Sequence, residues 1–287
     1  MSTSFDPKRI RTVLFDADGV LIHGRTPHPG AIKLLDWVRE SGRKLYVLTN
    51  NSSTARVKYA ARMRRLGFHL DQSEIITSGY LTARYFVECQ RTRPFPQFAV
   101  RQPHIFVVGG EGIATEFQAV RVRATLTRSV QDPRRPHFVI AGIDRSLTYA
   151  KIARAQRAIM VERALFIATN QDPTFPVEDG FQPGAGTVVA AIATAAGRPP
   201  DIVVGKPHPL AMRIALHTAE CKPSEVLIVG DRLDTDIETG RRARVFSVLV
   251  LSGVTTRERL RSVTDPMQWP DRVIGDVTEL RHLLTSA

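Results

Sequence analysis

The sequence predicts an α/β protein in which a second α/β domain is inserted into a core of parallel strands. Three observations lead to this fold class. Short apolar runs alternate with stretches of helical periodicity at both ends of the chain. The middle of the chain has strand and helix patterns of its own. Finally, 287 residues are more than one typical domain needs.

The N-terminal part has the pattern of a βαβ unit followed by one more helix and strand. Strands are expected at residues 12–15 and 45–49, with a helix at 29–41 between them. A helix at 54–66 and a strand at 75–77 follow. Strands joined by helices in this way form a parallel sheet.

The C-terminal part repeats this alternation. Strands are expected at residues 202–204, 226–229 and 245–251, and helices at 209–219 and 235–242. The strands are near-continuous apolar runs, which is typical of parallel strands buried on both faces. We therefore expect them to belong to the same parallel sheet as the N-terminal strands.

The middle block is the candidate second domain. Strands are expected at residues 105–108, 138–143 and 165–168, each leading toward a helical stretch. Residues 90–103 and 131–136 are rich in Pro and Arg and are expected to be exposed connections.

The chain is strongly basic, with 40 Lys and Arg against 28 Asp and Glu, which gives a net charge of +12. Basic domains often bind nucleic acid or acidic ligands. Only seven of the 40 basic residues are lysines, and the arginines are scattered rather than interleaved with aromatic residues. A solvated, arginine-rich surface is therefore favoured over a nucleic-acid-binding patch.

Cysteine content and hydropathy indicate the compartment. Cys89 and Cys221 lie far apart and form no disulfide framework, which fits a reducing environment. The N-terminus has no apolar stretch of secretory-signal length. The longest weakly polar stretch, residues 187–197, is shorter than the about 18 residues of a membrane span and is expected to be a buried helix. We expect a cytoplasmic protein that does not cross a membrane.

Four separated segments carry the polar residues that could perform chemistry. Each follows an apolar run, and in order they read FDADGV at 15–20, LTNNS at 48–52, GKPHP at 205–209 and GDRLDTD at 230–236. In an open parallel sheet, the carboxyl ends of the strands meet at one crevice, where ligands bind. The four segments are therefore expected to lie together.

These segments bring several carboxylates and one lysine to the same place. They contain Asp16, Asp18, Asp231 and Asp236, together with Lys206. Two carboxylates about 4 Å apart repel by about 4 kcal/mol at an effective dielectric constant near 20, so such a cluster needs a counter-charge. The ligands on offer are oxygens, without a Cys or His cluster, which favours Mg²⁺ over zinc. Because Mg²⁺ shares its coordination with substrate phosphates, a phosphorylated ligand is expected.

Two carboxylates one residue apart can take different roles in phosphoryl transfer. Asp16 can attack phosphorus to form an aspartyl-phosphate. Asp18 can protonate the leaving alkoxide and then deprotonate the attacking water. Thr49, the backbone that follows it and Lys206 can neutralise the phosphate oxygens.

Together the motifs DADG, TNN, GKPHP and GDRLDTDI resemble those of the haloacid dehalogenase-like superfamily of phosphatases, over nearly the whole chain. The resemblance implies a Rossmann-like parallel-sheet core and Mg²⁺ as the cofactor. It also implies residue roles. Asp16 would be nucleophile and metal ligand, Asp18 acid/base and a metal ligand through its carbonyl, and Asp231 a further metal ligand. Thr49, Asn50 and Lys206 would bind phosphate, and Asp236 would lie behind the metal ligands or serve as an alternate ligand.

Motif spacing indicates the subtype. Asp18 and Thr49 are 31 residues apart, a distance that one helix already fills, whereas Asn51 and Lys206 are 155 apart. The inserted domain is therefore placed at residues 85–200, with residues 1–84 and 201–287 forming the core. This order resembles subfamily IIA, whose C2-type cap occurs in nitrophenyl, nucleotide, pyridoxal phosphate, glycerol phosphate and phosphoglycolate phosphatases.

Several residues keep alternative interpretations. An aspartate after a strand commonly caps a helix or shapes a turn, and the TNN segment could cap the helix that follows it. A substrate contact by Asn51 is as well supported as a capping role. Asn170 and Asp172 in the cap are expected either to face the substrate or to shape a turn.

The expected reaction is Mg²⁺-dependent hydrolysis of small phosphate monoesters, such as nitrophenyl phosphate, sugar or glycerol phosphates, phosphoglycolate or nucleoside monophosphates. One alternative is a phosphotransferase or mutase that delivers the phosphoryl group to an alcohol. Another is a nucleic-acid-binding protein built on the same fold. The resemblance alone suggests a homodimer formed through the cap.

Overall fold

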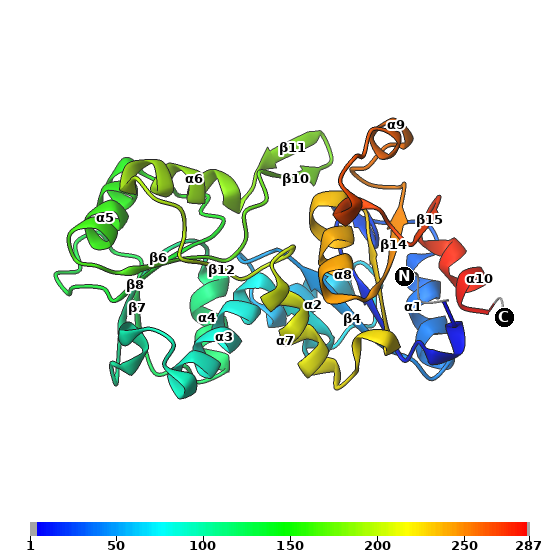
Figure 1. The fold of residues 1–287 in the computed structure, drawn as a ribbon, viewed down its shortest axis with the longest axis horizontal. Coiled ribbons are helices and arrows are strands. Elements are labelled where there is room, and N and C mark those ends of the chain that lie inside the picture. Colours follow the sequence, from blue (N-terminus) through cyan, green and yellow to red (C-terminus); the bar gives the residue numbers. More distant parts are fainter. Residues whose placement is uncertain (1–4, 286–287) are drawn as a thin grey trace.

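The chain folds into two α/β units placed side by side, as the computed structural model of residues 5–285 shows (Figure 1). One unit contains the first and last described residues and a six-stranded sheet. The other contains a five-stranded sheet formed by the middle of the chain. We call them the core and the cap. The expected fold class, an α/β core with an inserted α/β cap, is confirmed.

The core sheet has the strand order β15-β14-β13-β1-β4-β5, and all neighbouring strands are parallel. The first strand of the chain lies between β13 and β4, so the chain order reverses at β1. This reversal is the topological switch point at which open α/β sheets bind ligands. The strands are β1 Thr12–Phe15, β4 Lys44–Thr49, β5 Ile75–Thr77, β13 Val226–Gly230, β14 Phe246–Val250 and β15 Arg272–Ile274.

Alternation along β1 decides which helices cover each face of the core sheet. Val13 and Phe15 belong to the same buried cluster as residues of α1, α2 and α10, whereas Leu14 belongs to the cluster that includes α3 and α7. Successive side chains of a strand point to opposite faces, so both faces of the sheet are buried. The core helices are α1 Ala31–Glu40, α2 Arg56–Arg65, α3 Ser78–Thr92, α7 Pro209–Ala219, α8 Glu238–Ala243, α9 Arg257–Arg261 and α10 Leu280–Thr285.

The cap sheet has the order β12-β9-β8-β6-β7, again with parallel neighbours. Its strands are β6 His104–Val108, β7 Thr125–Thr127, β8 Phe138–Ala141, β9 Leu165–Ala168 and β12 Ile202–Val203, and its helices are α4 Glu111–Ala119, α5 Tyr149–Met160 and α6 Ala185–Ala196. Helices α5 and α6 cover one face. The other face joins a buried cluster that continues into the core sheet.

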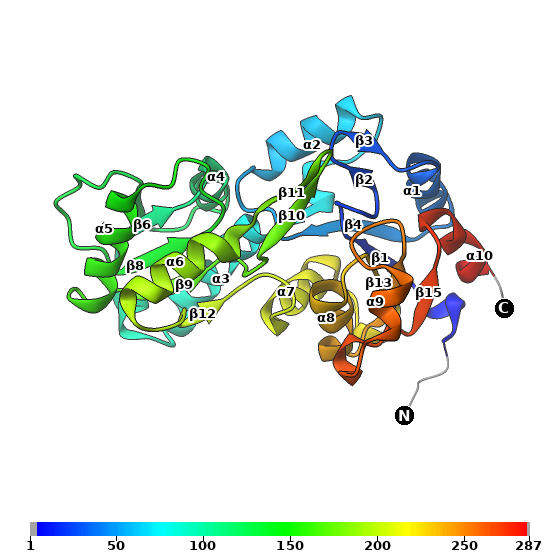
Figure 2. The same ribbon diagram turned by 90° about the horizontal axis from the view of Figure 1, so that it is seen from above.

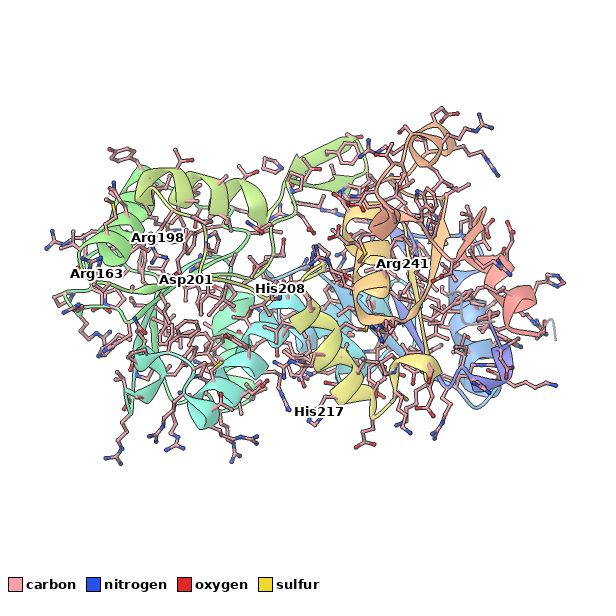
Figure 3. The ribbon with its side chains drawn as sticks, in the orientation of Figure 1. Arg163, Arg198, Asp201, His208, His217 and Arg241 are labelled. Carbon is pink, nitrogen blue, oxygen red and sulfur yellow. The ribbon has the colours of Figure 1, made fainter. Side chains whose placement is uncertain are left out.

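One expected core strand belongs to the cap instead. The strand expected at residues 202–204 is β12, and it pairs with β9 of the cap sheet. Asp201 fixes this edge, since its carboxylate Oδ2 accepts a hydrogen bond from the Phe166 N–H at 2.7 Å. Figure 3 labels Asp201 and His208, between which the chain returns from the cap to the core. An apolar run does not reveal which of two parallel sheets it will join.

Other differences from the sequence-based expectations concern connections. Residues 90–103 were expected to be exposed, but α3 continues to Thr92, and Phe98 is buried against Phe86 and Phe138. The hairpin of β10 Thr174–Val177 and β11 Gly180–Pro183 was not expected. Where the domain boundary falls stays a prediction.

The β10–β11 hairpin bridges the two units. Figure 2 shows it extending from the cap toward the small hairpin of β2 Ile22–His23 and β3 Thr26–Pro27 in the core. The Glu178 side chain at its tip lies against Gly24. The expected helix at 187–197 is α6, and only part of its surface is buried. Within residues 5–285, no helix is both long and apolar enough to cross a membrane.

A buried ion pair fastens the cap to the core. The Arg56 guanidinium, at the start of α2, donates to the Glu116 carboxylate of α4 at 2.9 Å and lies over the Tyr80 ring. The Arg56 N–H also donates to Glu116. The side chains of Arg56 and Glu116 are only 11% and 1% exposed. The same two helices also carry an exposed pair, Lys58 and Glu111.

We predict that Glu116→Ala lowers the free energy of unfolding by about 3 kcal/mol, because it leaves the Arg56 guanidinium buried without its carboxylate. Glu111→Ala is the matched control, and its expected loss is below about 1 kcal/mol because both partners are exposed. Urea denaturation measures both. Equal losses in the two variants would contradict a special role for the buried pair.

Candidate active site

The four motif segments meet at the carboxyl ends of β1, β4 and β13, under the cap. They line a cavity of about 80 Å³. Nine of the ten residues selected from the sequence line this cavity: Asp16, Asp18, Thr49, Asn50, Asn51, Asn170, Asp172, Lys206 and Asp231. The tenth, Asp236, is fully buried and contacts Lys206. The expectation that distant segments converge here is confirmed.

Lys206 lies at the centre of the charged cluster. Its Nζ donates to Asp16 Oδ1 at 2.7 Å and to Asp236 Oδ1 at 2.6 Å, and the residue is only 2% exposed. Burial alone would lower the pKa of Lys206, but the two carboxylates outweigh it and raise that pKa above its usual value. The lysine therefore stays an ammonium ion.

Three carboxylates surround this single ammonium group. Asp16, Asp231 and Asp236 each offer an oxygen, and these oxygens all lie within 4.8 Å of one another. Burial, with the neighbouring Asp236 charge, raises the pKa of Asp231 to about 7. Burial also raises the pKa of Asp16, although the charge of Lys206 opposes this. Fully ionised, the three carboxylates and Lys206 sum to −2, which a divalent cation would neutralise.

Asp231 has the geometry of a metal ligand. Its Oδ2 accepts a hydrogen bond from the Val254 N–H at 2.7 Å, whereas its Oδ1 is buried without any hydrogen-bond partner. A buried carboxylate oxygen without a partner is costly unless a cation binds it. Gly19 and Gly253 allow this approach, since a Cβ at either position would lie within 2.3 Å of Asp231 Oδ2. Oxygen-only ligands fit Mg²⁺.

Asp18 lies apart from the triad but in the same cavity. Its carboxylate does not belong to the group of three, which agrees with the expected metal contact through its carbonyl rather than its side chain. Burial raises the pKa of Asp18, and the charge of Arg62 opposes this rise. A carboxyl group with a raised pKa keeps its proton to a higher pH than an ordinary aspartate, which suits a proton donor.

Thr49 is the last residue of β4, and Asn51 lies two residues beyond it. The Thr49 hydroxyl accepts a hydrogen bond from the Asn51 N–H at 3.2 Å, which leaves its own O–H able to donate into the cavity. Asn51 Oδ1 accepts from the Thr54 N–H and from the Ser53 hydroxyl. Asn51 therefore shapes the entry to α2, and a substrate contact by this residue stays a prediction.

Asn50 holds Lys206 in place. Its Oδ1 accepts from the Lys206 N–H at 2.9 Å, and its Nδ2 donates to the Lys206 carbonyl at 2.9 Å. The same Nδ2 donates to both carboxylate oxygens of Asp172. These contacts occupy the side chain, so the predicted phosphate contact by Asn50 would have to come from its backbone.

The two cap residues also contact Asn50. Asn170 is 1% exposed and donates to the Asn50 carbonyl at 2.6 Å. Asp172 accepts from the Asn50 amide, and burial raises its pKa to about 6. His208 lies at the start of α7, where its Nδ1 accepts from the Leu210 N–H. Asn170 and Asp172 therefore connect cap and core, and whether they touch substrate stays a prediction.

Among the cavity residues that were not selected from the sequence, three have charged or aromatic side chains: Arg145, Phe175 and Arg232. Arg145 follows β8, so the strand-end rule that selected Asp16 would also have selected Arg145 had it been applied to the cap. Arg232 was part of a quoted motif but received no role. Phe175 belongs to the unexpected hairpin and had no signal in the sequence.

Comparison with known proteins identifies the family. The model described as haloacid dehalogenase-like hydrolase matches residues 13–123, and a second HAD-hydrolase-like model matches residues 203–280. Human chronophin is 36% identical over 88% of this chain and 85% of its own length. The chain belongs to the haloacid dehalogenase-like hydrolases. Within them it is of subfamily IIA type, as the motif spacing implied.

Solved structures of this family share the whole architecture. The p-nitrophenyl phosphatase from Archaeoglobus fulgidus superposes with a TM-score of 0.82 at 30% identity, covering 96% of this chain and 99% of that one. A glycerol phosphate phosphatase from Mycobacterium tuberculosis, in complex with magnesium, gives a TM-score of 0.82 at 33% identity, covering 96% and 77%. This haloacid dehalogenase-like hydrolase is a phosphatase for small phosphate monoesters.

We predict that Mg²⁺ binds more weakly as the pH falls below about 7. The raised pKa values of Asp231 and Asp16 mean that protons compete with the cation, so affinity should fall by up to about tenfold per pH unit. Calorimetric titration with Mg²⁺ in buffers of different ionisation enthalpy would show proton release near pH 6.5 and little at pH 8.5. An affinity that does not change from pH 5.5 to 8.5 would contradict this assignment.

The raised pKa values of the same carboxylates also determine how the stability of the metal-free protein should depend on pH. Because their pKa values are higher in the folded protein than in the unfolded chain, the folded state binds more protons between about pH 4 and 7. The stability of the EDTA-treated protein should therefore fall as the pH rises through this window. Added Mg²⁺ should restore it at pH 8, as measured by thermal unfolding.

Proposed function

We propose that this phosphatase hydrolyses small phosphate monoesters with Mg²⁺ through an aspartyl-phosphate on Asp16. The observation that carries the proposal is the buried group of Asp16, Asp231 and Asp236 around Lys206, which has an excess of negative charge and a carboxylate oxygen without a partner. Such a site suits a divalent cation and a phosphate together.

In the first half-reaction, an Asp16 oxygen attacks phosphorus and the bond from phosphorus to the alcohol oxygen breaks. Asp18 gives its proton to the departing oxygen, so the alcohol leaves neutral. The raised pKa of Asp18 supports this role. The Lys206 ammonium and the Thr49 hydroxyl face the same cavity and can stabilise charge on the phosphate oxygens.

In the second half-reaction, water attacks the phosphorus of the aspartyl-phosphate. Asp18, now ionised, accepts the proton of this water. The bond from phosphorus to Asp16 breaks, inorganic phosphate leaves, and both aspartates return to their starting states. Hydrolysis therefore needs one carboxylate as nucleophile and a second that carries the proton in both steps.

The residues that would hold Mg²⁺ are Asp16 and Asp231 through their carboxylates and Asp18 through its carbonyl. When bound, the ion would neutralise negative charge on these groups and on the phosphate. Asp236 would act behind them, because its two oxygens are already engaged by the Lys206 ammonium and the Arg232 N–H. A homodimer through the cap and a cytoplasmic location stay predictions.

The cap would exclude water from the reacting phosphate and contact the rest of the substrate. Its link to the core runs through the Asn50 amide, which joins Asp172 of the cap to the Lys206 backbone. If the substrate leaves both Asn50 contacts in place, the cap stays fixed over the substrate. Small esters, as named for the relatives compared above, fit the limited volume of the cavity.

We predict that Asp16→Asn keeps the fold and reduces hydrolysis of nitrophenyl phosphate to below about 0.1% of wild type, because the amide cannot attack phosphorus. Asp18→Asn should lower turnover by about 100-fold or more through loss of the proton carrier. Steady-state kinetics with Mg²⁺ measures both, and circular dichroism checks folding.

Near-normal turnover by pure, folded Asp16→Asn protein would refute the nucleophile assignment. Product analysis with added glycerol separates hydrolysis from phosphotransfer. A hydrolase releases equal amounts of alcohol and inorganic phosphate, whereas a phosphotransferase would release less phosphate and form glycerol phosphate.

A further inference from the structure

The catalytic cavity borders a second, larger cavity of about 680 Å³. Five residues line both and so mark the junction between them: Asp18, Asn51, Arg145, Phe175 and Pro176. Because Asp18 is the proposed proton donor to the departing oxygen, the alcohol part of the substrate must lie beside Asp18. This part of the substrate therefore meets the other junction residues.

Among the described residues, Arg145 is the one cation that lines both cavities, whereas Arg25, Arg62 and Arg65 line only the larger one. Lys206 contacts two carboxylates, and Arg232 is paired with Asp234 at 2.7 Å. No ion pair found within residues 5–285 includes Arg145. Its NH1 makes a neutral hydrogen bond to Gln182 Oε1 at 3.3 Å, and its guanidinium lies 5.6 Å from the centre of the Phe175 ring.

Hydrogen bonds to Asp144 hold the loop that carries Arg145. The neighbouring Asp144 carboxylate is buried and accepts hydrogen bonds from the Ser146 N–H at 2.9 Å and from Lys151 Nζ at 2.7 Å. The Ser146 hydroxyl also donates to it. The backbone on both sides of Arg145 is thus held by a buried carboxylate, while the Arg145 side chain itself is exposed.

Glu178, an acid that lines the larger cavity, has other partners. Glu178 lies against Gly24, and backbone hydrogen bonds together with the charge of Arg25 lower its pKa. Glu178 therefore interacts with the core loop at residues 24–25. The Arg145 guanidinium remains available to bind an anion.

We propose that Arg145 binds a second anionic group on the alcohol part of the substrate. This phosphatase then prefers short phosphate monoesters whose leaving group carries a carboxylate or a second phosphate. The planar guanidinium can donate two parallel hydrogen bonds to either group. The inference rests on the proposed function, because it places the alcohol beside Asp18.

Three esters of matched length test the preference. These are 2-phosphoglycolate with a carboxylate, ethylene glycol bisphosphate with a second phosphate, and 2-hydroxyethyl phosphate with a neutral end. We expect kcat/KM for at least one anionic ester to exceed that for the neutral ester by about tenfold or more. Comparing the two anionic esters shows whether Arg145 binds a carboxylate or a phosphate more tightly. Equal values for all three would overturn the inference.

Variants test whether Arg145 causes the preference for anionic leaving groups. Arg145→Gln should lower the ratio of anionic to neutral kcat/KM by about 10- to 100-fold. Arg145→Glu should move the preference toward O-phosphoethanolamine, whose leaving group is cationic. Arg272→Gln, an exposed arginine on β15, is the matched control and should leave the ratio unchanged. Melting temperatures check that each variant is folded.

The outcomes separate this inference from the proposed function. The role of Arg145 would be overturned if Arg145→Gln left the ratio of anionic to neutral kcat/KM unchanged, or if it lowered kcat/KM equally for every ester. Neither result would contradict the hydrolysis of phosphate monoesters. A wild-type protein that hydrolyses none of the esters, nitrophenyl phosphate included, would instead contradict the proposed function. Calorimetric binding of the same esters to Asp16→Asn with Mg²⁺ then still tests Arg145, because it requires no turnover.

Discussion

The buried ammonium group of Lys206, held between the carboxylates of Asp16 and Asp236, is the interaction on which the site depends. One ammonium cannot balance three buried carboxylates, because each close pair repels by several kcal/mol at protein dielectric. The remaining charge can be met by protons or by a divalent cation. Burial, together with this excess of negative charge, raises the pKa values of Asp16 and Asp231, and the same buried excess of charge favours the predicted Mg²⁺ site.

The position of Lys206 also explains why cap and core behave as one structure around the site. The lysine lies three residues after the end of β12, a strand of the cap sheet, yet its side chain contacts aspartates of the core. Asn50 joins the Lys206 backbone to Asp172, and the buried Arg56–Glu116 pair adds a second attachment. One apolar cluster also contains residues of both sheets, so cap and core share a buried interior.

The strand-end rule was sufficient to find Asp16, Thr49 and Asp231, because each follows an apolar run that did become a core strand. Lys206 was found by its motif, although the strand before it was wrongly assigned to the core sheet. Periodicity describes one strand and not its partner, so β12 could not be assigned to the cap. Side-chain contacts over long separations, such as that of Asn50 with Asp172, leave no local pattern. Arg145 was detectable only by applying the same rule to the cap.

We infer that a divalent cation binds between Asp16 and Asp231, beside Lys206. Anomalous diffraction from a crystal grown with Mn²⁺, a scattering substitute for Mg²⁺, would locate this ion. We expect one strong peak in contact with both carboxylates, including the Asp231 oxygen that has no hydrogen-bond partner. A map without a peak at this place, or with the ion bound elsewhere while these carboxylates stay unliganded, would contradict it.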